Sequence, residues 1–147
     1  MQERLNRESR SDLLRFTLAT MPTFRPADFH RRYYECLTKF ATGDIKKLMV
    51  FMPPQHGKSE GSTRRLPAFL LGKDPDKRLA IVSYNAPKAR KFNREIQRII
   101  DTPEYHAIFP ETCLNASNVT TIAGSWLRNA DECEIVGHRG GFKTVGV

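Results

Sequence analysis

The sequence has few cysteines and no long apolar run. Its three cysteines, Cys36, Cys113 and Cys133, are widely spaced and form no Cys-x-x-Cys pair, so neither a zinc site nor a disulfide framework is indicated. This usage is typical of a reducing compartment. No apolar run approaches the roughly 18 residues of a membrane span, and the N-terminus, Met-Gln-Glu-Arg-Leu-Asn-Arg, is too charged for a secretory signal. We therefore expect a soluble intracellular protein without a membrane partner.

Acidic residues are also in the minority. The 16 Asp and Glu residues face 24 Lys and Arg residues, which gives a formal net charge of +8 and a pI near 9.7. This balance favours a polyanionic partner such as nucleic acid. The alternative is a basic surface that is only solvated. A length of 147 residues with 39% apolar residues suits one hydrophobic core.

A possible phosphate-binding loop follows the longest apolar run before residue 60. Residues 48–52 are all apolar, which predicts a strand buried on both faces, and Pro53-Pro54 must end it. Gly57-Lys58-Ser59 then matches the closing triplet of a P-loop, in which backbone amides at a helix N-terminus cradle nucleotide phosphates. In this interpretation Lys58 reaches the β- and γ-phosphates of ATP, and the Ser59 hydroxyl coordinates Mg²⁺.

The loop lacks the first glycine of the P-loop pattern, because Met52 stands five residues before Gly57. Prolines have no N–H group, so the anion-binding amides must come from residues after Pro54. The predicted nucleotide-contacting residues are Gln55, His56, Gly57, Lys58, Ser59 and Glu60. An ordinary turn is the alternative interpretation.

The remaining pattern predicts alternating helices and strands. Residues 1–9 look polar and loose, and residues 102–118 irregular. Helices are expected over residues 11–21, 26–43, 58–71, with a kink at Pro67, and 86–100. Strands are expected over residues 78–84, 119–122, 125–127, 133–136 and 142–147. Strand 48–52, helix 58–71 and strand 78–84 would form a βαβ unit. Phe29 and His30 are candidates for an adenine pocket beside the loop.

Basic residues recur on one side of the helix over residues 86–100. Arg90, Arg94 and Arg98 are spaced by four residues, and Lys91 lies beside them. Such a row can contact DNA phosphates, although exposed helix faces are usually charged for solvation alone. Another candidate is Arg139, which lies in a glycine-rich turn, Gly137-His138-Arg139-Gly140-Gly141, and can serve as a catalytic arginine finger or as a plain turn residue.

The sequence also lacks the carboxylates that a P-loop ATPase needs to support Mg²⁺ and to orient the attacking water. No run of four apolar residues is followed by Asp or Glu. We therefore expect that the chain stops before its Walker B strand.

Four segments together resemble the large terminase subunit of tailed phages and prophages. They are residues 52–60, 65–72 and 83–86 and the stretch 137–147, and the resemblance spans nearly all of residues 25–147. It implies an α/β P-loop NTPase fold of the RecA-like class, with a sheet flanked by helices. Residues 1–24 would be an N-terminal segment with a short helix, residues 25–147 the front of the ATPase domain, and the C-terminal nuclease domain would be absent.

The resemblance also implies a function. In that family, ATP hydrolysis with Mg²⁺ drives double-stranded DNA into a procapsid in the host cytoplasm. The implied partners are the small terminase subunit, the procapsid portal and further copies of the chain in a homo-oligomeric ring. Family members often carry an arginine in the phosphate loop as a finger, whereas this loop has Gln55-His56. This difference draws attention to Arg139. Two alternatives remain open: another P-loop enzyme, such as a helicase or kinase, and a non-catalytic fragment of a decayed prophage gene.

Overall fold

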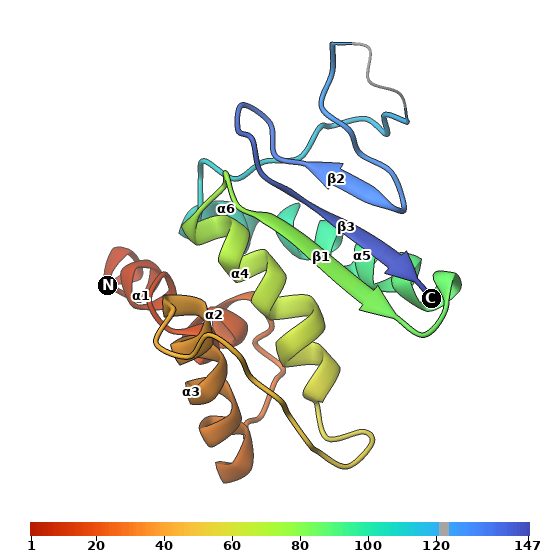
Figure 1. Cartoon of the computed structure of the whole chain (residues 1–147). Helices are drawn as coiled ribbons and strands as arrows, with labels where there is room; N and C mark the ends of the chain where they lie inside the picture. The colour runs from red at the N-terminus through yellow and green to blue at the C-terminus, as the bar shows by residue number, and fades with distance from the viewer. Residues whose placement is uncertain (121–123) are drawn as a thin grey trace.

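A small mixed sheet organises one half of the molecule. The computed structural model describes residues 1–120 and 124–147. The strands are β1 (Arg78–Ser83), β2 (Glu132–Glu134) and β3 (Gly141–Gly146) in the order β1-β3-β2. β1 and β3 run parallel, whereas β2 pairs with β3 in the antiparallel direction (Figure 1). The described chain is thus a mixed α/β structure.

Helix α5 (Ala86–Ile100) covers one face of this sheet. Leu79 lies opposite Phe142 in the register and Ile81 opposite Thr144, so these residues share a face. The buried Asn93 amide of α5 donates to the Thr144 hydroxyl at 3.2 Å, which ties the helix to the central strand. The opposite face, which carries Val82 and Val145, is exposed.

Five further helices form the other half of the molecule, and an aromatic cluster joins three of them. The five are α1 (Gln2–Ser9), α2 (Leu13–Thr20), α3 (Asp28–Thr42), α4 (Leu66–Lys73) and α6 (Pro103–Ile108), with the short π-helix η1 (Glu60–Arg65) leading into α4. Phe16 of α2 lies 5.5–5.9 Å, between ring centroids, from Phe69, Tyr105 and Phe109. All four rings are buried, and burial of such rings stabilises the fold by about 1.5–3 kcal/mol each. α2 therefore belongs to the same core as the later helices.

The elements with clear local signals are confirmed. α3 ends at Gly43, whose φ of 88° is the left-handed conformation that glycine adopts most easily. α5 begins after Asn85, whose side chain accepts a hydrogen bond from the Lys88 amide. The predicted strands 78–84, 133–136 and 142–147 correspond to β1, β2 and β3 with shifted ends, and the helix 11–21 corresponds to α2.

The predicted buried strand at residues 48–52 is wrong. This segment is extended but pairs with no strand among the described residues. Met49 and Phe51 are 82% and 86% exposed, whereas Leu48, Val50 and Met52 pack against the core. An extended run can bury both faces only when neighbouring strands and layers enclose it, and here it has a core on one side only.

The ends of several other predictions also need correction. Residues 2–9 are helical rather than loose, because α1 is held by hydrogen bonds from Asn6 to the Ala107 carbonyl and from Arg10 to the Ile108 carbonyl. Residues 103–108 form α6 after the N-cap Thr102 rather than an irregular segment. Over residues 58–71 the helix widens into η1 just before Pro67, which lacks the N–H group that regular helical bonding would need.

The strand predicted at 119–122 is reduced to an isolated bridge at Val119 in the described residues, and the strand predicted at 125–127 is wrong, because the next bridge lies at Arg128. Val119 pairs with Arg128, and Arg128 pairs with Cys133. Part of the first prediction, residues 121 and 122, lies outside the described residues. Among the described residues, none of the helices combines the length and apolar character needed to cross a membrane.

Candidate functional site

The loop between Pro53 and Lys58 has a tightly folded backbone. Gln55 and Gly57 both adopt positive φ angles, 63° and 78°. This conformation costs little for glycine but is strained for glutamine. At Gly57 a side chain would also approach the His30 ring to 3.2 Å. Loop strain of this kind is often found where a backbone is shaped for a ligand.

Helix α3 holds this loop from behind. The Tyr33 hydroxyl donates to the Lys58 carbonyl at 2.7 Å. His30 Nδ1 accepts from the Ala27 amide at 3.0 Å, which leaves the proton on Nε2, and Nε2 donates to the His56 carbonyl at 3.0 Å. Burial raises the pKa of the Tyr33 phenol, so it remains a donor at neutral pH. Two side chains of one helix therefore fix two carbonyls of the loop.

The supported carbonyls point toward α3, and the loop amides have no such partners. The backbone N–H groups of residues 55–59 make no hydrogen bond to any described part of the chain. Lys58 and Ser59 begin the helical stretch that continues into η1 and α4. Free amides at the start of a helix carry partial positive charge and are a ready site for an anion.

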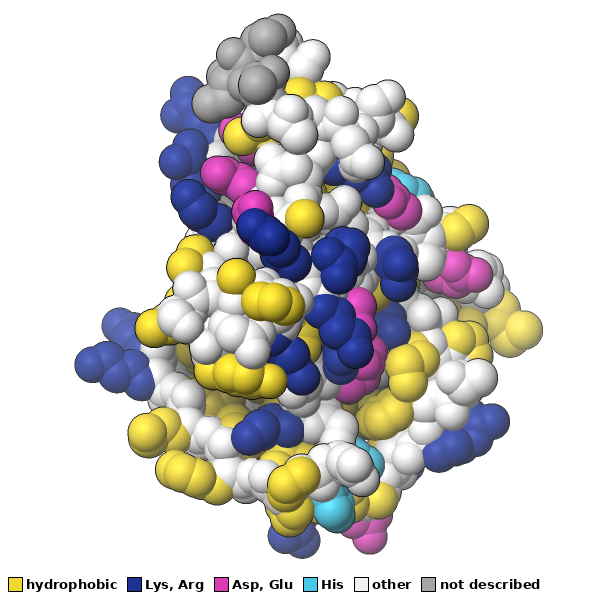
Figure 2. All heavy atoms as spheres, turned by 90° about the vertical axis from the view of Figure 1, so that its right-hand side faces the viewer, with side chains coloured by type: hydrophobic (Ala, Val, Ile, Leu, Met, Phe, Trp, Pro, Cys, Tyr) yellow, Lys and Arg dark blue, Asp and Glu magenta, His cyan; other side chains and the backbone are white. Residues whose placement is uncertain are grey.

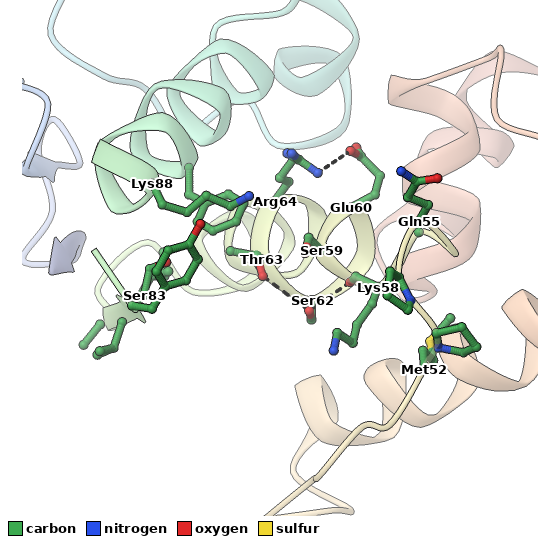
Figure 3. Close-up of a pocket in the computed structure, with 18 residues that line it drawn as sticks. Met52, Gln55, Lys58, Ser59, Glu60, Ser62, Thr63, Arg64, Ser83 and Lys88 are labelled. Atoms are coloured by element: carbon green, nitrogen blue, oxygen red, sulfur yellow. Dashed lines mark hydrogen bonds and ion pairs between the residues drawn. The ribbon is translucent and has the colours of Figure 1, made fainter. Parts of the chain in front are cut away.

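These residues border a cavity of about 1040 Å³. One wall is the loop with the helix that follows it, and the other is the end of β1 with the first turns of α5 (Figure 3). Figure 2 views the side toward which β1 and β3 point, and it shows Lys and Arg side chains gathered around a few acidic groups in the middle of that face. The structure thus brings Gln55, Gly57, Lys58, Ser59 and Glu60 together at one cavity. His56 belongs to the loop but does not line the cavity.

Two lysines supply uncompensated positive charge to this cavity. Lys58 is exposed, and Lys88 is half-buried in the first turn of α5. Neither ammonium group forms an ion pair or a hydrogen bond with the described residues. The Lys88 ammonium lies 5.4 Å from the centre of the Phe92 ring. An anion in the cavity would meet both charges.

Glu60 lies in a group of ion pairs, and its contact with a nucleotide stays a prediction. Its carboxylate lines the cavity but accepts hydrogen bonds from Arg64 at 3.2 Å and from the buried Arg65 at 2.7 Å. Arg64 is shared with Glu95 of α5, so the four side chains balance one another in charge. Glu60 therefore links the first helical turns to one another and is already engaged before any ligand binds.

Ser59, the predicted Mg²⁺ ligand, also lines the cavity. Its position at the start of the helix suits a hydroxyl that reaches an ion beside a phosphate. The described residues contain no group of three or more His, Cys, Asp and Glu side chains arranged to hold a metal ion. An Mg²⁺ ion at Ser59 would therefore take most of its ligands from phosphate and water, which is its usual preference.

The basic row on α5 is exposed, as its spacing predicted. Arg90 is engaged with Asp131 at 2.8 Å, whereas Lys91, Arg94 and Arg98 have no ion pair within residues 1–120 and 124–147. The row therefore presents three free charges rather than four. Its role in DNA contact stays a prediction.

Arg139 lies far along the sheet from the cavity. The parallel register places Arg78 beside Gly141 and Ser83 beside Gly146. The turn before β3 therefore lies at the start of the two strands, whereas the cavity lies at the C-terminal end of β1. The Arg139 backbone is anchored by Asp76, at 2.8 Å, and its side chain is exposed. Within one copy of the chain it does not join the loop residues. A role as a finger toward a neighbouring copy stays a prediction.

Sequence reasoning missed three parts of this site. Tyr33 is buried in α3, and its hydroxyl supports the loop, a contact that no local sequence pattern signals. His30 was considered only for an adenine pocket. Lys88 lies off the regular basic row of α5, so no pattern singled it out. An N-cap at Asn85, which places the third residue after it in the first helical turn, was the one available signal for Lys88.

No protein-family model, curated protein or solved structure matches this chain. The function of the cavity must therefore be inferred from its own geometry and chemistry.

Proposed function

We propose that the cavity binds an Mg²⁺-nucleoside triphosphate, and that the chain is the nucleotide-binding part of a P-loop ATPase of the RecA-like class. One observation carries this proposal: the backbone amides of residues 55–59 have no hydrogen-bond partner among the described residues, and they lead into a helix start beside a large cavity that the unpaired Lys58 also lines. Amides and a lysine in this arrangement suit phosphate oxygens. A carboxylate or sulfate would use the amides but would leave most of the cavity empty.

The chain's residues would act by binding and orienting the nucleotide. The amides of residues 55–59 would hold the inner phosphates, Lys58 would neutralise the charge between the outer ones, and Ser59 would contribute a hydroxyl to Mg²⁺. Tyr33 and His30 keep the loop in its binding conformation before the ligand arrives. Preorganised donors lose little conformational entropy on binding. Phe29, at a ring distance of 5.8 Å from His56, offers an exposed aromatic surface beside the loop that suits an adenine base.

The resemblance to large terminase subunits gives this ATPase its proposed task, the translocation of double-stranded DNA into a procapsid in the host cytoplasm. The net charge of +8 and the free charges of Lys91, Arg94 and Arg98 support a DNA partner. A homo-oligomeric ring, the small terminase subunit and the portal follow from the same resemblance.

A nucleotide titration tests the central claim. A fluorescent ATP analogue with Mg²⁺ would be titrated into the wild type, Lys58→Ala and Lys47→Ala, an exposed lysine outside the cavity that serves as the control for lost charge. We expect Lys58→Ala to weaken binding by roughly 10- to 100-fold, because a charged hydrogen bond contributes about 1.5–3 kcal/mol. Lys47→Ala should bind normally. A folded Lys58→Ala protein with unchanged affinity would contradict the phosphate-loop assignment.

A further inference from the structure

The cavity has a second cationic wall that the phosphate loop does not provide. Lys88 is fixed in the first turn of α5, because its amide donates to the capping side chain of Asn85 at 2.8 Å. Its side chain reaches from α5 toward the helix that follows the loop, so it faces the cavity from the side opposite Lys58 (Figure 3).

Packing holds the Lys88 side chain in this position. Its ammonium lies 5.4 Å from the centre of the Phe92 ring, and the Arg64 guanidinium lies 5.4 Å from the centre of the same ring. Phe92 is 6% exposed, so the ring is a fixed support. A cation against an aromatic ring is attracted to it without giving up its own hydrogen-bonding capacity. The three N–H donors of Lys88 therefore remain available to a ligand.

The charge balance of the cavity singles out the two lysines. Arg64 faces two carboxylates, Glu60 and Glu95, and Glu60 is also bound by Arg65, so this group contributes no net charge. Among the described residues that line the cavity, Lys58 and Lys88 are the cations without an acidic partner. A ligand that satisfies both must carry negative charge at two separated points.

We propose that Lys88 binds the outermost phosphate of a nucleoside triphosphate and so distinguishes triphosphates from diphosphates. This inference rests on the proposed function. The loop amides take the inner phosphates, which ATP and ADP share, and Lys58 lies between the outer two. The last phosphate projects from the loop toward the β1 and α5 wall. Lys88 adds a charged hydrogen bond that ADP is too short to receive. Tyr84 and Ser83, at the end of β1, line the same wall and contain no opposing charge.

The experiment compares two ligands across matched variants. Calorimetry would measure the binding of Mg²⁺ with a non-hydrolysable ATP analogue and of Mg²⁺-ADP to the wild type, Lys88→Gln and Lys47→Gln. Lys47 is exposed and lies outside the cavity, so it controls for the lost charge. We expect Lys88→Gln to bind the triphosphate about tenfold more weakly and ADP within about twofold of the wild type. Lys47→Gln should bind both as the wild type does.

Inorganic tripolyphosphate and pyrophosphate repeat the comparison without the base. The same selective loss for tripolyphosphate would confirm that Lys88 detects the number of phosphates. An equal loss for both ligands, or no loss in a Lys88→Gln protein with normal circular dichroism, would overturn the inference while leaving the proposed function in place. A wild type that binds none of the four ligands would overturn both.

Discussion

The Tyr33 hydroxyl and the Lys58 carbonyl are joined by a 2.7 Å hydrogen bond that links helix α3 to the phosphate loop. The same carbonyl accepts a second bond from the Ser62 hydroxyl at 2.9 Å. The fit is close, because a Cβ atom at Gly61 would lie 2.7 Å from the Tyr33 ring. The orientation of Lys58 is therefore set from outside the loop.

This contact predicts a binding defect without unfolding for Tyr33→Phe. The Lys58 carbonyl keeps its bond from Ser62, so stability should fall by only about 1 kcal/mol. Nucleotide affinity should fall by roughly 3- to 10-fold, because the loop loses part of its preorganisation. The control is Tyr34→Phe, the same chemical change on the next residue, whose hydroxyl makes no hydrogen bond to the described residues. Equal nucleotide affinity in all three proteins would show that α3 does not position the loop.

Removal of the Tyr34 hydroxyl should increase the stability of the protein. This hydroxyl is fully buried and has no hydrogen-bond partner among the described residues, and an unpaired buried polar group costs about 1–3 kcal/mol. Tyr34→Phe should therefore raise the free energy of unfolding by about 1 kcal/mol near neutral pH. Urea titrations of the two proteins would measure the difference, and a destabilised variant would indicate a bond that the hydroxyl makes.

The effect of Tyr34→Phe should grow at alkaline pH. Burial raises the pKa of Tyr34 from 10.0 to about 12. The unfolded chain then loses its proton before the folded chain does, so the wild type loses stability as the pH rises from 10 toward 12, by up to about 1.4 kcal/mol per unit. Tyr34→Phe lacks this contribution, whereas the other tyrosines contribute equally to both proteins. The stability difference should therefore be larger at pH 11 than at pH 8.

The sequence predicted the parts of this structure that local signals determine. The cap at Asn85 and the glycine at position 43 mark ends of α5 and α3 that the structure confirms. The apolar run at residues 48–52 led to a wrong strand prediction, because a strand exists only where another segment pairs with it. For the site, the loop pattern identified Lys58 and Ser59. It did not identify Tyr33 or Lys88, which meet the loop or its cavity only through tertiary packing.

The free charges of α5 predict a salt-dependent interaction with duplex DNA. Arg94→Gln combined with Arg98→Gln should weaken binding and reduce the slope of log affinity against log salt by roughly 0.9 for each lost phosphate contact. The control is Arg31→Gln with Arg32→Gln, an equal change in charge at exposed positions of α3. Fluorescence anisotropy over a range of salt concentrations measures both slopes. Identical slopes for the two double variants would mean that only net charge matters.

The position of Arg139 predicts an effect that crosses between copies of the chain. It lies at the end of the sheet where β1 and β3 begin, away from its own cavity, on a turn fixed by Asp76. In an assembly that hydrolyses ATP, adding Arg139→Ala subunits should lower turnover more steeply than dilution alone, because an arginine finger changes the rate by orders of magnitude. Arg7→Ala, which removes an exposed charge on α1, should act as wild type. A decline in proportion to the Arg139→Ala fraction would make it a turn residue.

The chemistry of the cavity wall predicts that residues 1–147 bind Mg²⁺-ATP without turning it over. Among the described residues lining the cavity, Glu60 alone carries a carboxylate, and both of its oxygens accept hydrogen bonds from arginines. A carboxylate held in this way is a poor base for the attacking water. Without an oriented water the transition state loses orientational and electrostatic stabilisation, which typically accounts for several powers of ten in rate.

Calorimetry together with a phosphate-release assay on purified residues 1–147 would test this prediction. We expect Mg²⁺-dependent binding and no steady release of phosphate, in the wild type and in Glu60→Gln alike. Lys58→Ala identifies any contaminating ATPase, because a signal that persists in that variant does not come from this site. Steady hydrolysis that Lys58→Ala removes would contradict the prediction. If Glu60→Gln also removed it, Glu60 would be the catalytic base, and its bonds to the arginines would have to break when nucleotide binds.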